Sequence, residues 1–115
     1  MKLIIGHIYP ELLNMYGDKG NLTVLKKRIE MRGIECEVRE FRLEDEISLS
    51  DTDIVYIGGG GDKEILISLE KLNLKKEELK GYVENSGVLL AVCSGYELIA
   101  KEFYLKDKKH EGLGL

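Results

Sequence analysis

Cys93 has the surroundings of a reactive side chain. It follows the apolar run Val88–Val92 and precedes Ser94 and Gly95, and the apolar spacing of Tyr96–Phe103 then predicts a helix. A cysteine on a tight turn between a buried strand and a helix matches the nucleophile-elbow arrangement, which exposes the side chain and needs small neighbours. The unpaired amides of a helix N-terminus also favour the thiolate, the form of cysteine that attacks.

The chain has one other cysteine, Cys36, and the two lie too far apart to suggest a metal site or a disulfide scaffold. Cys36 falls within Ile34–Phe41, where apolar and charged residues alternate, and we expect it to be a buried strand residue. For Cys93, the pattern alone also allows a small buried residue at the end of a core strand. The sequence thus predicts no metal site, and one of its two thiols is a candidate nucleophile.

Four glycines, Gly58–Gly61, follow the apolar run Ile54–Ile57. Acyl chemistry at a thiol places negative charge on a carbonyl oxygen, and backbone N–H groups that glycines leave uncovered can stabilise that charge. We therefore expect Gly59 or Gly60, with the amide of Ser94, to form an oxyanion hole that binds substrate.

The same glycines also suit a flexible turn or a phosphate-binding loop before a helix. Asp62 argues against phosphate because its charge would repel the anion. The run also lacks the G-x-G-x-x-G spacing and the Lys-Ser/Thr ending of nucleotide-binding loops. A flavodoxin-like or Rossmann-type nucleotide binder is therefore the weaker interpretation.

Tyr9–Asn21 forms an unusually long first loop that is rich in turn residues and polar side chains. Long first loops are often functional. Taken by themselves, Asn14, Asp18 and Asn21 are more typical of turn and helix-cap residues than of catalytic ones.

Strands alternate with helices along the chain, which predicts a single α/β domain with a doubly wound, mainly parallel sheet and helices on both faces. We expect Ile34–Phe41 to lie nearer a sheet edge, Val88–Val92 to be buried, and Gly33 to end the first helix. Both glycine-rich turns then lie at the carboxyl edge of the sheet, where such folds bind ligands. The expected strands are Leu3–Ile5, Ile34–Phe41, Ile54–Ile57 and Val88–Val92, and the expected helices are Leu25–Arg32 (opened by Asn21–Thr23), Asp62–Leu69, Leu74–Asn85 and Tyr96–Phe103.

The bulk composition is that of a folded domain, with 43% hydrophobic and 33% charged residues and a net charge of −4. The densest basic cluster, Lys106–Lys109, has no interleaved aromatic residues, so nucleic acid is not an expected partner. No apolar run approaches the roughly 20 residues that span a bilayer, and Met1–Ile5 is too short for a signal peptide. We therefore expect a cytoplasmic protein with no membrane span.

Three segments together resemble the class I glutamine amidotransferases. Within that family they are most similar to the cobyric-acid-synthase-like branch, which includes the glutaminase subunit of lipid II isoglutaminyl synthase. The resemblance covers nearly the whole chain in order and spacing. Its motifs are the first loop from Ile5–His7 through Tyr16–Asn21, the glycine-rich segment Tyr56–Glu64 and the nucleophile segment Ala91–Leu98.

This resemblance implies a flavodoxin-like core and a glutaminase that needs no cofactor. Cys93 would attack the side-chain amide of glutamine, release ammonia and form a glutamyl thioester that water hydrolyses. In the branch concerned, ammonia passes to a Mur-ligase-like synthetase partner that amidates the peptidoglycan precursor lipid II.

The resemblance also implies that residues 1–115 represent the N-terminal part of an apparently truncated domain, because the family's catalytic histidine lies further downstream. His7 is expected just after the first strand and His110 on a solvated surface, and neither matches that histidine. The family usually has glutamine where this chain has Glu97, and commonly glycine in place of Ser94. The alternatives are a non-catalytic, partner-binding module and a fragment of a cobyric-acid-synthase-type amidotransferase.

Overall fold

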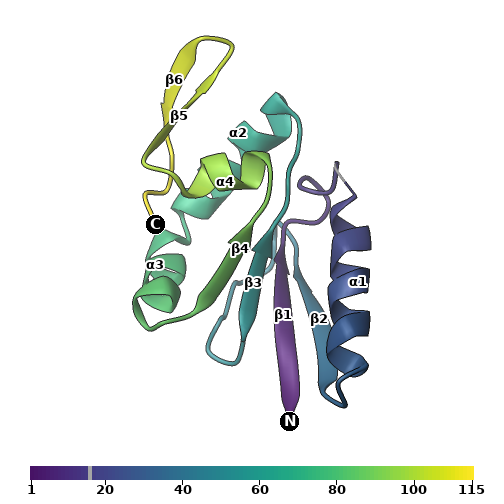
Figure 1. Cartoon of the computed structure of the whole chain (residues 1–115). Helices are drawn as coiled ribbons and strands as arrows, with labels where there is room; N and C mark the ends of the chain where they lie inside the picture. Colours follow the sequence, from purple (N-terminus) through teal and green to yellow (C-terminus); the bar gives the residue numbers. More distant parts are fainter. Residues whose placement is uncertain (16) are drawn as a thin grey trace.

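Four strands form one parallel sheet in the order β2-β1-β3-β4 (Figure 1). The computed structural model describes residues 1–15 and 17–115, and Tyr16 of the first-loop motif lies outside the described residues. The strands are β1 (Lys2–Ile8), β2 (Glu35–Phe41), β3 (Ile54–Ile57) and β4 (Val88–Ala91).

The strand order confirms the expected doubly wound fold. The chain passes from β1 to β2 on one side and then returns past β1 to β3 and β4, so the winding direction reverses between β1 and β3. In register, Ile5 of β1 lies between Val38 of β2 and Ile54 of β3, and Ile54 also pairs with Val88 of β4. Ligands of such folds bind near this reversal point, at the carboxyl ends of the strands.

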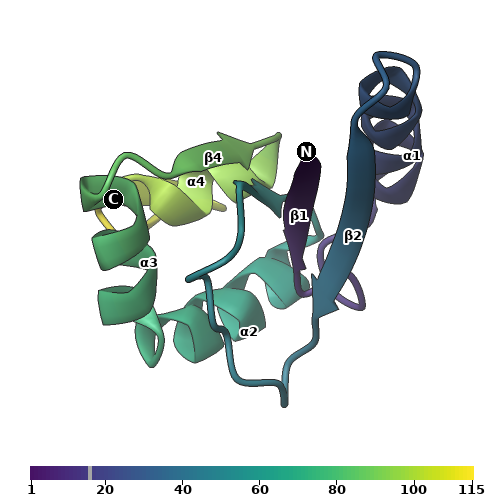
Figure 2. The same cartoon turned by 90° about the horizontal axis from the view of Figure 1, so that it is seen from below.

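Helices cover both faces of the sheet, as predicted (Figure 2). α1 (Asp18–Glu30) packs on one face, where Leu22 and Ile29 meet Ile5, Cys36 and Tyr56. A larger cluster fills the opposite face beneath α2 (Asp62–Asn73), α3 (Lys76–Glu84) and α4 (Ser94–Ile99). None of the helices in the described part of the chain is long and apolar enough to cross a membrane.

β3 is apolar throughout because both of its faces are covered. Val55 and Ile57 belong to the larger cluster, whereas Tyr56 belongs to the cluster under α1. Alternate residues of a strand point to opposite faces, so a strand between two helical layers has no polar side. The continuous apolar run of β3 therefore predicted its position correctly.

The first strand and first helix are both longer than expected. β1 continues through His7 to Ile8, so His7 is a buried strand residue and not part of the loop that follows. Helix α1 begins at Asp18 because Gly17 adopts a left-handed conformation (φ 71°) and Asn14 Oδ1 accepts the Lys19 N–H at 2.9 Å.

The end of the first helix agrees with prediction. Gly33 has φ 77° and its N–H donates to the carbonyl of Glu30 at 2.9 Å. A left-handed glycine just beyond a helix is a common way to satisfy its last carbonyl groups. Gly33 thus ends α1 and directs the chain into β2, which lies at the expected sheet edge.

β4 is not the buried strand that its composition suggested. Within the described residues it pairs only with β3 and forms the other edge of the sheet, and the residues Val88 and Leu90 are 55% and 43% exposed. An apolar strand is buried only if another element covers it, and in the described structure none covers this part of β4.

The last predicted helix is also too long. α4 ends at Ile99, and Phe103 instead lies in β5 (Glu102–Leu105), which pairs antiparallel with β6 (Lys108–Glu111). Lys106 and Asp107 connect the two strands with φ values of 50° and 65°, the signs of a type I′ turn. Leu98 of α4 and Phe103 of β5 nevertheless belong to the same core cluster.

His110 was expected on a solvated surface, and in the structure it is half-buried. It lies in β6, and its ring stacks on Phe103 with 5.5 Å between ring centroids and 25° between ring planes. This aromatic contact belongs to the β5–β6 hairpin.

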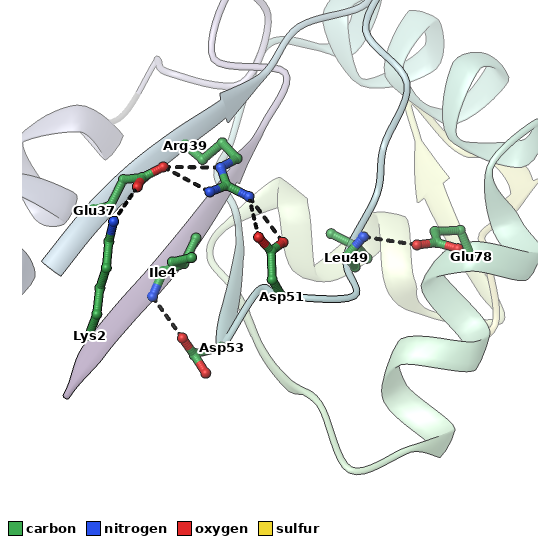
Figure 3. A network of polar contacts seen from close by, with 8 residues as sticks. All are labelled: Lys2, Ile4, Glu37, Arg39, Leu49, Asp51, Asp53 and Glu78. Atoms are coloured by element: carbon green, nitrogen blue, oxygen red, sulfur yellow. Dashed lines mark hydrogen bonds and ion pairs between the residues drawn. The ribbon is translucent and has the colours of Figure 1, made fainter.

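A polar network holds the edge strand β2 to its neighbours (Figure 3). Glu37 of β2 accepts from Lys2 of β1 at 2.9 Å and from Arg39 at 3.0 Å, and Arg39 also binds both carboxylate oxygens of Asp51 at 3.0 Å. The nearby Ile4 N–H donates to Asp53 at 2.8 Å. Hydrogen bonding to Arg39 lowers the pKa of Asp51.

Candidate active site

Cys93 lies on a strained turn between β4 and α4. Its backbone has φ 56° and ψ −128°, a region that costs roughly 1–3 kcal/mol for a residue with a side chain. The turn is closed by the Gly95 N–H, which donates to Val92 at 3.0 Å, and by the Tyr96 N–H, which donates to Cys93 itself at 3.0 Å. The residue is exposed, as expected for a nucleophile elbow and unlike a buried core cysteine.

The end of β3 supports this turn from below. The Val92 N–H donates to the Ile57 carbonyl at 2.9 Å. A Cβ atom at Gly95 would lie 2.5 Å from the carbonyl oxygens of both Ile57 and Gly58. Glycine is therefore required at position 95 for the elbow to approach the glycine-rich loop this closely.

The glycine-rich loop meets the elbow through Ser94. The Gly60 N–H donates to Ser94 Oγ at 3.0 Å, and the Ser94 hydroxyl donates back to the Gly60 carbonyl at 3.1 Å. The Gly59 N–H points elsewhere and donates to Asp18 Oδ2 at 3.4 Å. The structure thus brings the predicted residues Cys93, Ser94, Gly59 and Gly60 to one edge of the sheet, where both glycine N–H groups donate to side chains.

A buried polar cluster joins the first loop to this edge. Asp18 is fully buried, and its Oδ1 accepts the Tyr56 hydroxyl at 2.8 Å. Asn21 Nδ2 in turn donates to the Tyr56 oxygen at 3.3 Å. Burial, followed by the hydrogen bond to Asp18 and the charge of Asp18, raises the pKa of Tyr56 to about 12, although the hydrogen bond from Asn21 acts in the opposite direction.

Asp18 and Tyr56 are the residues that the sequence interpretation missed. Asp18 was expected to be a turn or cap residue, whereas the side chain that accepts a backbone N–H in the first turn of α1, that of Lys19, belongs to Asn14. One signal was available: the first loop must return to the carboxyl edge of the sheet, where an acidic side chain can accept hydrogen bonds from glycine N–H groups.

His7 is enclosed beside this cluster. Only 1% of the residue is exposed, its ring contacts Tyr56 edge-on with 5.5 Å between centroids, and its Nε2 has no hydrogen-bond partner among the described residues. His7 also borders a cavity of about 330 Å³ between β2 and α1. Burial lowers the pKa of His7, which favours the neutral ring at pH 7.

Within the described residues, no group of three or more His, Cys, Asp or Glu side chains is arranged to hold a metal ion. The groups that the structure brings together at this edge of the sheet are the exposed thiol of Cys93, the glycine-rich loop and the hydroxyl of Ser94.

Comparison with known proteins connects this arrangement to a family. Residues 4–115 match the CobB/CobQ-like glutamine amidotransferase domain. The chain belongs to this family. The match includes the first loop, the glycine-rich loop and the Cys93 elbow, which confirms the resemblance inferred from the motifs.

Three curated relatives share its sequence. The lipid II isoglutaminyl synthase (glutamine-hydrolyzing) subunit GatD of Streptococcus pneumoniae is 39% identical over 99% of this chain and 44% of the relative. GatD of Staphylococcus aureus is 34% identical over 99% of this chain and 47% of the relative. Cobyrinate a,c-diamide synthase of Sulfolobus acidocaldarius is 28% identical over 93% of this chain and 23% of the relative. This glutamine amidotransferase-like chain thus spans about half the length of the two GatD proteins.

Proposed function

We propose that this chain is the N-terminal, nucleophile-bearing part of a glutaminase that supplies ammonia to a synthetase. One observation carries the proposal: the exposed Cys93 lies on a strained strand-to-helix turn against which the glycine-rich loop packs. Membership of an amidotransferase family and the names of the two GatD relatives support glutamine as the substrate.

The reaction begins when the Cys93 thiolate attacks the side-chain amide carbon of glutamine. The carbonyl oxygen becomes negative, and backbone N–H groups of Gly60 and Ser94 stabilise it once the ligand oxygen replaces Ser94 Oγ at the Gly60 N–H. The carbon–nitrogen bond then breaks, and the nitrogen takes up a proton and leaves as ammonia. Water hydrolyses the remaining thioester, so the net products are glutamate and ammonia.

The leaving nitrogen and the attacking water both need a proton-transfer group. His7 is enclosed with its pKa lowered by burial, and His110 stacks on Phe103 in the β5–β6 hairpin. In this proposal the group therefore comes from outside residues 1–115, either from a further polypeptide segment or from the synthetase.

The ammonia acceptor is proposed from the relatives. The two relatives of 39% and 34% identity are named as subunits of lipid II isoglutaminyl synthase, whereas the cobyrinate synthase is 28% identical. We therefore favour a Mur-ligase-like synthetase that amidates lipid II in the cytoplasm over a corrinoid-modifying partner.

The test measures ammonia and glutamate release from glutamine by the full-length protein, alone and with the Mur-ligase-like synthetase. We expect release that Cys93→Ala abolishes, by at least about a thousandfold, and that Cys36→Ala retains. Equal release by wild type and Cys93→Ala would rule out the thiol mechanism.

A second candidate is a non-catalytic module that binds the synthetase. It is favoured by the observation that both candidate oxyanion donors, the Gly59 and Gly60 N–H groups, already donate to side chains. Stable binding to the synthetase without any glutamine hydrolysis would support this alternative and overturn the first.

A further inference from the structure

Asp18 is a buried carboxylate to which the reaction above gives no role. It is fully buried at the first position of α1. A buried carboxylate is strongly unfavourable unless it is hydrogen-bonded or paired, and Asp18 accepts hydrogen bonds from the Tyr56 hydroxyl at 2.8 Å and the Gly59 N–H at 3.4 Å. Its carboxyl group also packs so closely on Gly58 that a Cβ atom there would clash with it.

The first loop holds Gly59 at both of its backbone polar groups. Asp18 accepts the Gly59 N–H, and the Met15 N–H donates to the Gly59 carbonyl at 3.0 Å. Glycine has more conformational freedom than any other residue, so a run of four glycines keeps one conformation only if its neighbours impose it. Asp18 therefore orients the peptide group between Gly58 and Gly59, and Met15 orients the next one, between Gly59 and Gly60.

The orientation of one of these peptide groups matters for Cys93. The Gly59 carbonyl and the Gly60 N–H belong to the same peptide group, and in a trans peptide they point in opposite directions. Because the carbonyl faces Met15, the N–H must face the elbow, where it meets Ser94 Oγ at 3.0 Å. Rotation of this peptide would turn the Gly60 N–H away from the nucleophile.

We infer that Asp18 is a positioning residue that, by anchoring Gly59, keeps the Gly60 N–H directed at the Cys93 turn. This inference rests on the proposed glutaminase function, in which that N–H binds the developing oxyanion. Asp18 itself does not touch the substrate. It fixes the loop before the ligand arrives, so no reorganisation is needed during the reaction.

The kinetic test compares Asp18→Ala with Asp18→Asn in the full-length protein with its synthetase. Asp18→Ala should lower kcat for glutamine hydrolysis by roughly 10- to 100-fold and change KM little, because the lost interaction acts on the transition state. Asparagine keeps an oxygen for the Gly59 N–H and an amide donor for the Tyr56 oxygen, so Asp18→Asn should recover most of kcat. Asp62→Ala, which removes an exposed carboxylate beside the same loop, is the matched control.

Alkylation of Cys93 by iodoacetamide separates positioning from misfolding. Displacement of iodide by a thiolate builds no oxyanion, so its rate should stay within about twofold of wild type in Asp18→Ala. A parallel loss of kcat and alkylation rate would show that Asp18 only maintains the fold. An unchanged kcat in Asp18→Ala would also overturn the inference.

Amide hydrogen exchange tests the inference even if wild type hydrolyses no glutamine. Asp18→Ala should speed exchange of the Gly60 N–H by at least about tenfold, although that group bonds to Ser94 and not to Asp18. Exchange at Val55 in β3 should not change. If Gly60 keeps its protection, Asp18 does not position this peptide, whatever the activity of the protein.

Discussion

Each edge strand of the sheet has a cysteine within it or just after it, and the two cysteines have opposite environments. Cys36 lies within β2, is only 6% exposed and packs under α1. Cys93 lies one turn beyond β4, is exposed and has a positive φ. The comparison shows that backbone position decides the chemistry of a thiol: a residue inside a covered strand is enclosed, whereas one on a strained turn is presented to solvent.

The two edge strands also differ in how well their side chains are covered. β2 is covered by α1 and carries Glu37 and Arg39, which form ion pairs with neighbouring segments. In β4, by contrast, Val88 and Leu90 are exposed. They pair with Ile54 and Tyr56, which belong to the cluster under α1, so they lie on the same face of the sheet as α1 but in a part that α1 does not cover. Charged side chains protect a sheet edge from further pairing, and an apolar edge lacks that protection.

Thiol labelling should show the largest contrast. We expect iodoacetamide to modify Cys93 at least about a hundredfold faster than Cys36 in the native protein at pH 7.5, because labelling of Cys36 requires local opening. Burial, followed by the charge of Glu30, also raises the pKa of Cys36, so less thiolate is present at that pH. Peptide mass spectrometry over a time course measures both rates. Comparable rates in the native protein, with equal rates in denaturant as control, would contradict the assigned environments.

Gly95→Ala should have the next largest effect because it forces the elbow away from β3. The added Cβ would lie 2.5 Å from two carbonyl oxygens, and overpacking of this kind typically costs about 1–3 kcal/mol. Chemical denaturation measures the loss of stability, and the same change should slow glutamine hydrolysis. Gly20→Ala is the control, since a Cβ there meets nothing within 4 Å. Equal stability of both variants would show that the elbow does not pack tightly on the glycine-rich loop.

The features that the sequence predicted well are those encoded in short segments. The apolar run Ile54–Ile57, the glycines after it and the small residues around Cys93 each specify a local conformation, and together they placed the candidate site at the carboxyl edge. The roles of Gly59, Gly60, Ser94 and Cys93 in catalysis stay predictions.

The features that were missed depend on distant residues or on unusual turns. The contact of Asp18 with Tyr56 joins residues 38 positions apart, and no local pattern indicates it. Lys106 and Asp107 form a turn that glycine or asparagine usually occupies, so the β5–β6 hairpin had no recognisable signal. The exposure of Leu90 depends on what covers β4 and not on the composition of the strand.

The bare edge predicts self-association of the 115-residue chain. We expect wild type to form dimers at micromolar concentration, and Leu90→Lys to weaken the association by about tenfold, since lysine on an edge strand opposes pairing. Sedimentation velocity measures the change. Val24→Lys, at an exposed apolar residue of α1, should have little effect. A wild-type chain that sediments as a clean monomer would show that the β4 edge does not bind a second copy.

The charged edge should show the smallest effect. Arg39→Ala removes the ion pairs with Glu37 and Asp51, but exposed pairs contribute little, so we expect Tm to fall by at most a few degrees relative to an Arg28→Ala control. Salt near 1 M should reduce the difference because it screens exposed charges.

The pH dependence of this small effect has a definite sign. Hydrogen bonds to Lys2 and Arg39 lower the pKa of Glu37, and those to Arg39 lower the pKa of Asp51. A carboxylate whose pKa is lower in the folded state stabilises it above its unfolded pKa, about 4, and this contribution is lost as the pH falls through the folded pKa. The Tm difference between Arg39→Ala and wild type should therefore persist at pH 7 and shrink below about pH 4. A difference of the same size below pH 4 would show that Arg39 stabilises β2 by packing and not through its carboxylate partners.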